Sequence, residues 1–285
     1  MIKLNDSSIK YYLLFGCDIS NQFYDVGGLL PDNEKSLRSD TIILLIVNIK
    51  THKVKIVSIL RDICVNDNNY GKCKLNSLIV YYGPKKATKK IGNLFGIHIN
   101  KYIVLNMVNM VKIIDLIGGI DIYLTRPEVD YINGMGFDSA SLTRHKDGYE
   151  TLDSEGLNHL NGIKTLTHVR NRAVGFCWER AKRQRNVIVA VVSKITNTIK
   201  PENYFSFGRS LLSYVKTNLN IFDIISLAKI AKKIKINEIE TFSIPLQNTN
   251  SIKNDGVWRF EINFEDANVL LCKIVNEEDT SELVV

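Results

Sequence analysis

The sequence has few cysteines and no motif that would make them ligands. Its 285 residues include Cys17, Cys64, Cys73, Cys177 and Cys272, and neither a CxxC pair nor a Cys/His cluster occurs among them. Zinc and iron sites built on thiolates usually show such spacing. A thiolate metal site is therefore not expected, and a small disulfide-stapled fold is excluded.

Long hydrophobic runs are also missing. The longest, at residues 41–49, is far shorter than the roughly 20 residues that span a bilayer. Residues 1–22 lack the cationic start and apolar centre of an export signal. From the sequence we expect neither a membrane-spanning helix nor an export signal in this chain.

Neither sign of charge dominates, and no internal repeat or Pro/Ser/Gly-rich linker divides the chain. Lys and Arg number 37 against 30 Asp and Glu, a net charge of +7, which suits phosphorylated substrates, phospholipid surfaces or nucleic acid. Apolar residues make up 45% of the chain, enough for a sizeable core. We expect one domain over residues 1–285, with a core at about 10–200 and residues 201–285 packed on it.

Alternating strand and helix patterns predict a layered α/β architecture. The predicted strands cover residues 11–15, 41–49, 54–60, 102–105, 120–124, 238–244 and 257–262. The predicted helices cover residues 84–96, 107–117, 163–169, 179–198, 221–234 and 264–275. Residues 20–39 and 126–154 show no periodicity and are predicted surface loops.

The densest chemical signal is a basic cluster around the start of the predicted helix at 179–198. Its members are Arg170, Arg172, Arg180, Arg183 and Gln184. The last three are spaced to share a helix face that becomes apolar at Val187 and Val191. Cations in a first helical turn oppose the helix dipole, and guanidinium groups match phosphate oxygens. The cluster indicates a phosphate or pyrophosphate site; a solvated basic face paired with carboxylates is the alternative.

Charged residues also stand next to predicted strands. Arg61 and Asp62 end the strand at 54–60, Asp18 follows the strand at 11–15, and Asp40 precedes the strand at 41–49. Sites in α/β sheets collect at strand ends, and two carboxylates brought together there could bind Mg²⁺. Turn-capping aspartates and an ordinary Arg61–Asp62 ion pair are the alternative.

Other catalytic motifs are absent. Gly118-Gly119 ends a predicted helix outside any GxGxxG or GxxxxGK[ST] motif, and no GxSxG occurs. His159 and His168 are nine residues apart, and we expect them to be structural.

Seven segments, in order along the chain, resemble the LytR-CpsA-Psr family of bacterial envelope phosphotransferases. They are Leu14-Phe15-Gly16-Cys17-Asp18, Arg38-Ser39-Asp40-Thr41, Ser58-Ile59-Leu60-Arg61-Asp62, Lys74-Leu75-Asn76, Gly118-Gly119-Ile120-Asp121, Leu160-Asn161-Gly162 with Val169-Arg170-Asn171-Arg172, and Arg180 to Gln184. Residues 216–245 also resemble the last third of the family's domain. Together the segments span nearly the whole chain.

The resemblance implies an α/β/α layered domain with a central mixed β-sheet and an apolar tunnel for a polyprenyl chain. By this resemblance the main pyrophosphate residues are Arg61, Arg172 and Arg180, completed by Asp62, Arg170, Arg183 and Gln184. The metal ligands for Mg²⁺ or Mn²⁺ are Asp18 and Asp40. The lipid tail is expected along Val187 and Val191.

The implied reaction moves a glycopolymer phosphate, such as a teichoic acid or capsule chain, from a polyprenyl-pyrophosphate carrier to peptidoglycan. It implies work at the outer face of the cytoplasmic membrane, with Asp62 or a metal-associated aspartate as the base. A non-catalytic, regulatory protein that binds polyprenyl phosphate or anionic glycan is the alternative. Nucleic acid is not an expected partner, because recognition-helix, RNP and zinc-finger motifs are missing.

The chain departs from the family pattern in four ways. Leu60 stands where the motif usually has Pro, and residues 175–178 lack the Asp of a common Gly-Asp pair. The segment between Asp18 and Asp40 is long, and the usual N-terminal membrane helix is not seen in this sequence.

Overall fold

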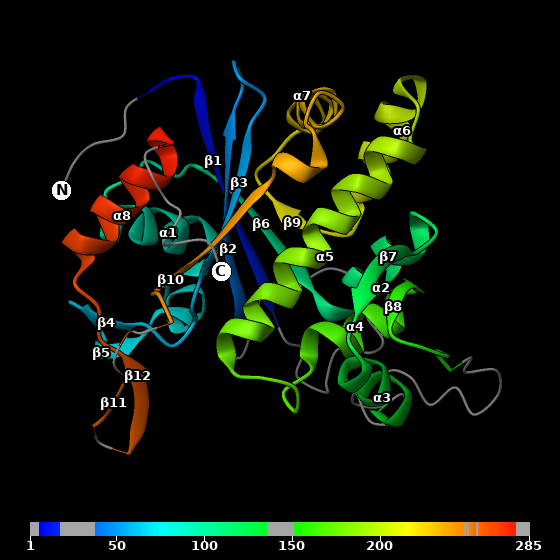
Figure 1. Ribbon diagram of the computed structural model, residues 1–285. Helices are drawn as coiled ribbons and strands as arrows, with labels where there is room; N and C mark the ends of the chain where they lie inside the picture. Colours follow the sequence, from blue (N-terminus) through cyan, green and yellow to red (C-terminus); the bar gives the residue numbers. More distant parts are fainter. Residues whose placement is uncertain are drawn as a thin grey trace.

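A computed structural model describes residues 6–17, 38–135, 151–247, 249, 251–254 and 256–277, which form a layered α/β fold (Figure 1). The strands are β1 (Ile9–Cys17), β2 (Ser39–Asn48), β3 (Val54–Ile59), β4 (Cys64–Asp67), β5 (Gly71–Lys74), β6 (Lys101–Asn106), β7 (Ile120–Leu124), β8 (Gly156–Leu160), β9 (Lys216–Thr217), β10 (Glu240–Ile244), β11 (Ser251–Asn254) and β12 (Val257–Phe260). The helices are α1 (Leu78–Leu94), α2 (Met107–Leu116), α3 (Arg126–Met135), α4 (Gly162–Arg170), α5 (Cys177–Thr198), α6 (Tyr204–Ser213), α7 (Ile221–Ala231) and α8 (Phe264–Asn276).

The central sheet is mixed, as expected. Its six strands lie in the order β10-β3-β2-β1-β6-β9. β1 pairs antiparallel with β2 and parallel with β6, while β3 pairs antiparallel with β2 and parallel with β10. The middle strands are buried on both faces and therefore read as continuous apolar runs rather than as alternating ones.

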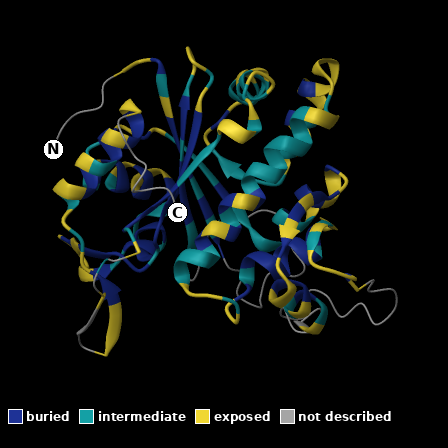
Figure 2. Ribbon diagram, viewed as in Figure 1, coloured by how far each residue is buried: buried dark blue, intermediate teal, exposed yellow. Residues whose placement is uncertain are grey.

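Helices cover both faces of this sheet (Figure 1). Leu13 and Phe15 belong to the core cluster shared with α1 and α8, whereas Tyr12 belongs to the cluster shared with α5 and α7. This alternation along β1 is the period-2 pattern of a strand between two layers. Figure 2 shows the buried residues concentrated in the sheet and the exposed ones on the outer sides of the helices. The α/β/α layering implied by the family resemblance is confirmed.

A second core cluster lies beyond the sheet, among α2, α3, α4, β7 and β8. Ile114, Ile132 and Leu166 are buried in it, and Val187 of α5 joins it. α5 therefore packs against the sheet and this second layer at the same time, so a side chain on α5 can face the space between them.

Several parts of the prediction were wrong. Residues 126–135 form helix α3 rather than loop, and α1 begins at Leu78, ahead of Pro84, with non-helical dihedrals at Gly83 (φ 68°). The hairpin β4–β5, strand β8 and helix α6 were not predicted. Short elements of this kind draw their stability from tertiary contacts and carry little periodicity.

Among the described residues, no helix combines the length and apolar character needed to cross a bilayer. The five cysteines form no disulfide with one another.

Candidate functional site

A cavity of about 320 Å³ lies between the sheet and helices α2, α4, α5 and α7. Its walls are predominantly aliphatic, with Leu14 and Ile43 from the sheet, Val187 and Val191 from α5, and Ile224 from α7 among them. Close-packed protein interiors rarely leave a void of this size, and apolar pockets of it are typical of ligand sites. The valines expected along a lipid tail do line it.

Charged side chains line one end of the cavity. They are Asp40, Arg170, Arg172 and Arg180, accompanied by Gln184. A smaller pocket of about 20 Å³ shares Asp40, Arg180 and Gln184 with the cavity, and adds Arg61 and Asp62. The two pockets therefore meet at a polar junction that contains four arginines against two aspartates.

The segment that carries Arg61 and Asp62 is held by backbone hydrogen bonds to three other parts of the chain. Asn76 N donates to Arg61 O at 3.1 Å, and Phe260 N donates to Asp62 O at 2.9 Å. Leu60 N donates to the carbonyl oxygen of Ile244 at 2.8 Å, a bond that Pro could not make. The departure at Leu60 thus extends the pairing of β3 with β10 up to the site.

Gly16 brings β1 and β2 close together where they meet the cavity. A Cβ at this position would lie 2.9 Å from Thr41 Cβ, and the β1–β2 register shifts between Gly16 and Cys17. A larger residue here would push β2, and with it Asp40, away from β1.

Arg61 links the two aspartates. Its guanidinium is ion-paired with Asp40, and its Nε donates to Asp62 Oδ2 at 3.1 Å. Burial lowers the pKa of Arg61, but the two carboxylates outweigh burial and raise it. Arg172 Nη2 lies 3.9 Å from Asp40 Oδ2, with 66% of its side chain exposed. Arg61 is therefore fixed, while Arg172 is free to meet a ligand.

Lys74 is a site residue that the sequence analysis left without a role. Its Nζ donates to Asp62 Oδ1 at 2.5 Å, so both oxygens of Asp62 are bound by cations. Its place in the motif Lys74-Leu75-Asn76, which carries part of the family resemblance, was the available signal. Lys74 adds positive charge beside the junction of the pockets.

Arg180 lies among like charges. Burial lowers its pKa, and the nearby Arg61 and Arg172 lower it further, only partly opposed by Asp40 and Asp62. Within the described ranges no ion pair is recorded for its guanidinium. An anion between Arg172 and Arg180 would relieve this repulsion, which makes the end of the cavity a favourable place for a phosphate group.

Arg183, expected beside Arg180, lies elsewhere. It is 5% exposed, donates to the carbonyl oxygen of Asn171 at 2.7 Å, and lies 3.6 Å from Glu128 of α3. Arg183 thus connects α5 with Glu128 of α3 and with Asn171, the residue after α4. Arg185, likewise buried, donates to Ser58 Oγ at 3.0 Å and to Ser243 Oγ at 2.7 Å, between β3 and β10.

The described residues bring one of the two expected metal ligands to the junction. Asp40 is there, while Asp18 lies outside the described residues. Both Asp40 oxygens lie toward guanidinium groups, and no group of three or more His, Cys, Asp or Glu that could hold a metal ion occurs in the part of the chain that is described. Within the described residues the structure therefore supplies one of the two carboxylates expected to hold Mg²⁺.

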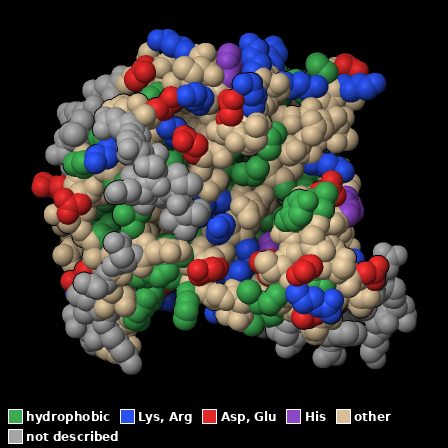
Figure 3. All heavy atoms as spheres, viewed as in Figure 1, with side chains coloured by type: hydrophobic (Ala, Val, Ile, Leu, Met, Phe, Trp, Pro, Cys, Tyr) green, Lys and Arg blue, Asp and Glu red, His purple; other side chains and the backbone are tan. Residues whose placement is uncertain are grey.

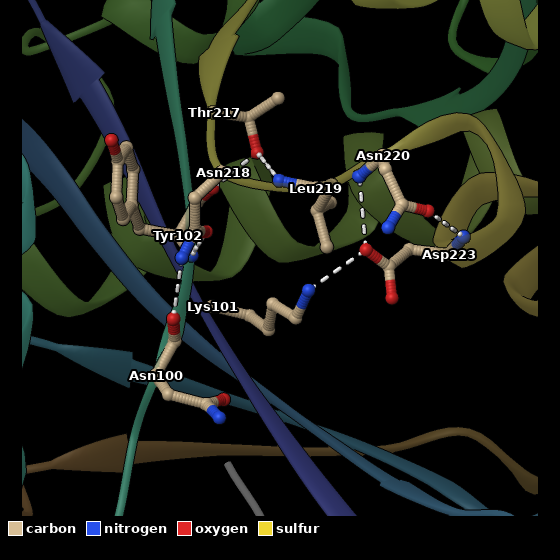
Figure 4. Close-up of polar contacts among 8 residues, drawn as sticks. All are labelled: Asn100, Lys101, Tyr102, Thr217, Asn218, Leu219, Asn220 and Asp223. Atoms are coloured by element: carbon tan, nitrogen blue, oxygen red, sulfur yellow. Dashed lines mark hydrogen bonds and ion pairs between the residues drawn. The ribbon is translucent and has the colours of Figure 1, made fainter.

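A network of polar contacts fixes the opposite end of the cavity, where β9 leads into α7 (Figure 4). The Asn218 side chain bridges two backbone groups of the β6 region, donating to Asn100 O at 2.6 Å and accepting from Tyr102 N at 3.0 Å. Asp223 accepts from Asn220 N at 2.9 Å and from Lys101 Nζ at 2.8 Å. These contacts hold Leu219 and Ile224 in the cavity wall.

The sequence was compared with the sequences of known protein families. Residues 4–273 match the LytR_cpsA_psr family. The chain belongs to this family. Five of the seven segments that carry the resemblance supply residues that line the cavity or the smaller pocket.

Two curated proteins similar to this chain come from Streptococcus mutans and Enterococcus faecalis. "Biofilm regulatory protein A" of Streptococcus mutans is 30% identical over 192 residues, 64% of this chain and 45% of that protein. "Polyisoprenyl-teichoic acid--peptidoglycan teichoic acid transferase TagU" of Enterococcus faecalis is 28% identical over 194 residues, 67% of this chain and 58% of that protein. The matches thus span about half the length of these relatives.

Solved structures share the family fold. "TagT bound to LIIa-WTA" superposes with a TM-score of 0.72 at 21% identity, covering 97% of this chain and 94% of that one. The structure titled "LytR-CPS2A-psr family protein YwtF (TagT) with bound octaprenyl pyrophosphate lipid" gives 0.66 at 21% identity, covering 97% and 95%. "Crystal structure of B. subtilis TagT" gives 0.70 at 21% identity, covering 97% and 94%.

Proposed function

We propose that this protein transfers a glycopolymer phosphate from a polyprenyl-pyrophosphate carrier to a hydroxyl of peptidoglycan. One observation carries the proposal: the aliphatic cavity of about 320 Å³ ends at Arg170, Arg172 and Arg180. A polyprenyl tail suits the aliphatic walls, and a pyrophosphate suits the arginines. The names of TagU and of the lipid-bound TagT structure support the same reading.

The transfer forms one P–O bond and breaks another. The acceptor hydroxyl oxygen bonds to the phosphorus that bears the glycopolymer, and the bond from that phosphorus to the bridging oxygen breaks. Polyprenyl phosphate leaves with the bridging oxygen, and the hydroxyl proton passes to a carboxylate. Charge grows on the phosphate oxygens and on the leaving phosphate, so positioned cations lower the barrier. Arg61, Arg172 and Arg180 are the cations that we assign to this role.

Two carboxylates are candidates to receive the proton. Asp40 and Asp62 line the smaller pocket. Asp62 has both oxygens bound by Arg61 and Lys74, whereas Asp40 Oδ2 is 3.9 Å from Arg172. A pH–rate profile of Asp62→Asn beside that of Asp40→Asn assigns the base.

Magnesium, held by Asp18 and Asp40, belongs to this proposal. Carboxylate oxygens are the ligands that Mg²⁺ prefers, and the cation would add positive charge beside the pyrophosphate. Mn²⁺ would suit the same ligands.

We also propose that the protein works in the cell envelope, at the outer face of the cytoplasmic membrane. The carrier lipid and the peptidoglycan acceptor meet there, and the net charge of +7 favours an anionic membrane surface and an anionic donor. No nucleic acid takes part in the proposed reaction.

A transfer assay separates this function from the binding-only alternative. The purified protein is incubated with a polyprenyl-pyrophosphate-linked glycopolymer and peptidoglycan, with and without Mg²⁺, and the peptidoglycan is analysed for new phosphodiester. Enzyme-dependent phosphodiester supports the transferase. Lipid binding without phosphodiester under all conditions would leave a carrier-binding protein.

A further inference from the structure

Four aromatic residues at the start of α5 and on β12 make up what we call the aromatic rim: Phe176, Trp178, Trp258 and Phe260. Phe176 precedes α5 and is 84% exposed, and Trp258 on β12 is 37% exposed. Large apolar side chains gathered on a surface commonly mark a binding site. Figure 3 shows hydrophobic side chains near β12 and the start of α5, beside acidic and basic ones.

Three of the four rings are in contact, with Phe260 between the two tryptophans. The ring of Phe260 lies 5.2 Å from that of Trp178 and 4.4 Å from that of Trp258, both in edge-to-face geometry. Trp178 is fixed in turn, because its Nε1 donates to Pro245 O at 3.0 Å. Trp258 therefore rests on a buried, ordered base and needs little ordering when a ligand binds.

The rim is joined to the candidate catalytic residues. Phe260 lines the smaller pocket together with Arg61 and Asp62, and its backbone N–H donates to Asp62 O. Trp258 is two residues from Phe260 on the same strand, a separation of about 7 Å. A ligand on Trp258 would thus extend into the smaller pocket within one or two sugar rings.

The rim lies on the side of the junction away from the lipid cavity. The cavity and the smaller pocket share Asp40, Arg180 and Gln184, while Phe260 belongs to the smaller pocket and Val191 and Ile224 to the cavity. In phosphoryl transfer the attacking and leaving oxygens lie roughly in line. If the tail of the leaving group occupies the cavity, the attacking hydroxyl must approach from the side of Phe260.

We infer that the aromatic rim binds the saccharide of the acceptor, a stretch of peptidoglycan glycan strand; this inference rests on the proposed transfer. The apolar face of a pyranose ring packs against Trp258 and Phe176, and a ring hydroxyl reaches the smaller pocket. The Lys72–Glu261 ion pair, at 2.6 Å, joins β5 to the residue that follows β12 and offers polar partners. Sites for small ligands are usually lined by aromatic and apolar side chains with a small number of polar groups beside them.

Binding without donor tests the rim independently of transfer. Soluble chitooligosaccharide and uncross-linked glycan strands are titrated into the full chain, with tryptophan fluorescence and calorimetry as readouts. We expect Trp258→Ala and Phe176→Ala each to weaken glycan binding at least tenfold. Phe176→Ala is the safer variant for folding, because only the backbone N–H of Phe176 caps α5, donating to Glu179 at 2.9 Å. Tyr123→Ala, which removes an aromatic side chain 77% exposed on β7, is the matched control and should bind as wild type.

Steady-state kinetics then identifies which substrate uses the rim. A rise in the acceptor KM with an unchanged donor KM supports the inference. A rise in the donor KM alone would assign the rim to the donor saccharide, and loss of binding to anionic vesicles with unchanged glycan affinity would assign it to the membrane; either result overturns the inference. Rim-dependent glycan binding by a protein that transfers nothing would overturn the proposed function but not the glycan site.

Discussion

The guanidinium of Arg61, just after β3, is ion-paired with the carboxylate of Asp40 in β2. This pair ties together two strand ends that form one side of the junction between the cavity and the smaller pocket. Since Nε of Arg61 is also held by Asp62, the guanidinium has a single orientation. Such preorganisation lowers the reorganisation needed when charge develops on a phosphate.

Arg61→Ala should leave the protein folded and reduce transfer at least about 100-fold, the usual effect of removing one positioned donor. Arg61→Lys should recover only part of the rate, since an ammonium cannot reproduce the bidentate contact. The control is Arg126→Ala, which removes an exposed arginine of α3 paired with Asp130. Transfer by folded Arg61→Ala at near the wild-type rate would remove Arg61 from the mechanism.

Chelation should abolish transfer, and added Mg²⁺ should restore it. Asp18→Asn and Asp40→Asn are each expected to raise the Mg²⁺ concentration for half-maximal rate, because a carboxylate ligand is lost. Their melting temperatures should change less than their metal dependence. Undiminished activity in chelator would contradict the magnesium proposal.

Val191→Trp should block the cavity. Val191 lines it from α5, so an indole there would fill space needed by a lipid tail. We expect lipid binding to fall at least tenfold while the Mg²⁺ dependence of any residual activity is unchanged. Asn186→Trp, at an exposed position on the same helix, is the control. Equal lipid affinity of the two folded variants would show that the tail lies elsewhere.

Acid should destabilise the protein through His168, which is 1% exposed. Burial lowers its pKa to about 4, with Arg183 adding to this and Glu128 opposing it. Because the folded pKa is below the ordinary value of 6.5, the unfolded chain takes up the proton first as pH falls. Stability should therefore drop between about pH 6.5 and pH 4, by on the order of 1 to 3 kcal/mol.

Urea unfolding at pH 7.5, 6 and 4.5 measures this dependence. His168→Phe keeps the site filled without a titrating group, and its free energy of unfolding should change less over the same range. An equal slope in both proteins would assign the acid sensitivity to other groups.

Much of the sheet could be predicted because its signals are local. β2 and β3 are long β-branched and aliphatic runs joined by a short polar turn, and Asn161 caps α4 by accepting from Lys164 N at 2.9 Å. α5 was predicted from the spacing of its apolar residues. In each case the neighbouring residues alone determine the structure.

The predictions were wrong where residues far apart in the sequence determine the structure. Helical spacing places Arg180 and Arg183 near each other, but Glu128 draws Arg183 away, and Glu128 lies in α3. α3 is only ten residues long and contains Gly134, which weakens the helical signal, and it is held by burial of Val129 and Ile132. Because α3 was not predicted, the position of the Arg183 side chain could not be predicted either. The aromatic rim likewise joins residues near 177 and 259 that share no sequence pattern.

Native mass spectrometry of the protein purified from its own host tests most directly whether the cavity holds a polyprenyl tail with its pyrophosphate on the arginines. Val191→Trp and Asn186→Trp are purified alongside. We predict one bound polyprenyl phosphate or pyrophosphate in the wild type and in Asn186→Trp, and little or none in Val191→Trp. Wild-type protein that carries no such lipid, and takes up none when polyprenyl pyrophosphate is added, would contradict the account.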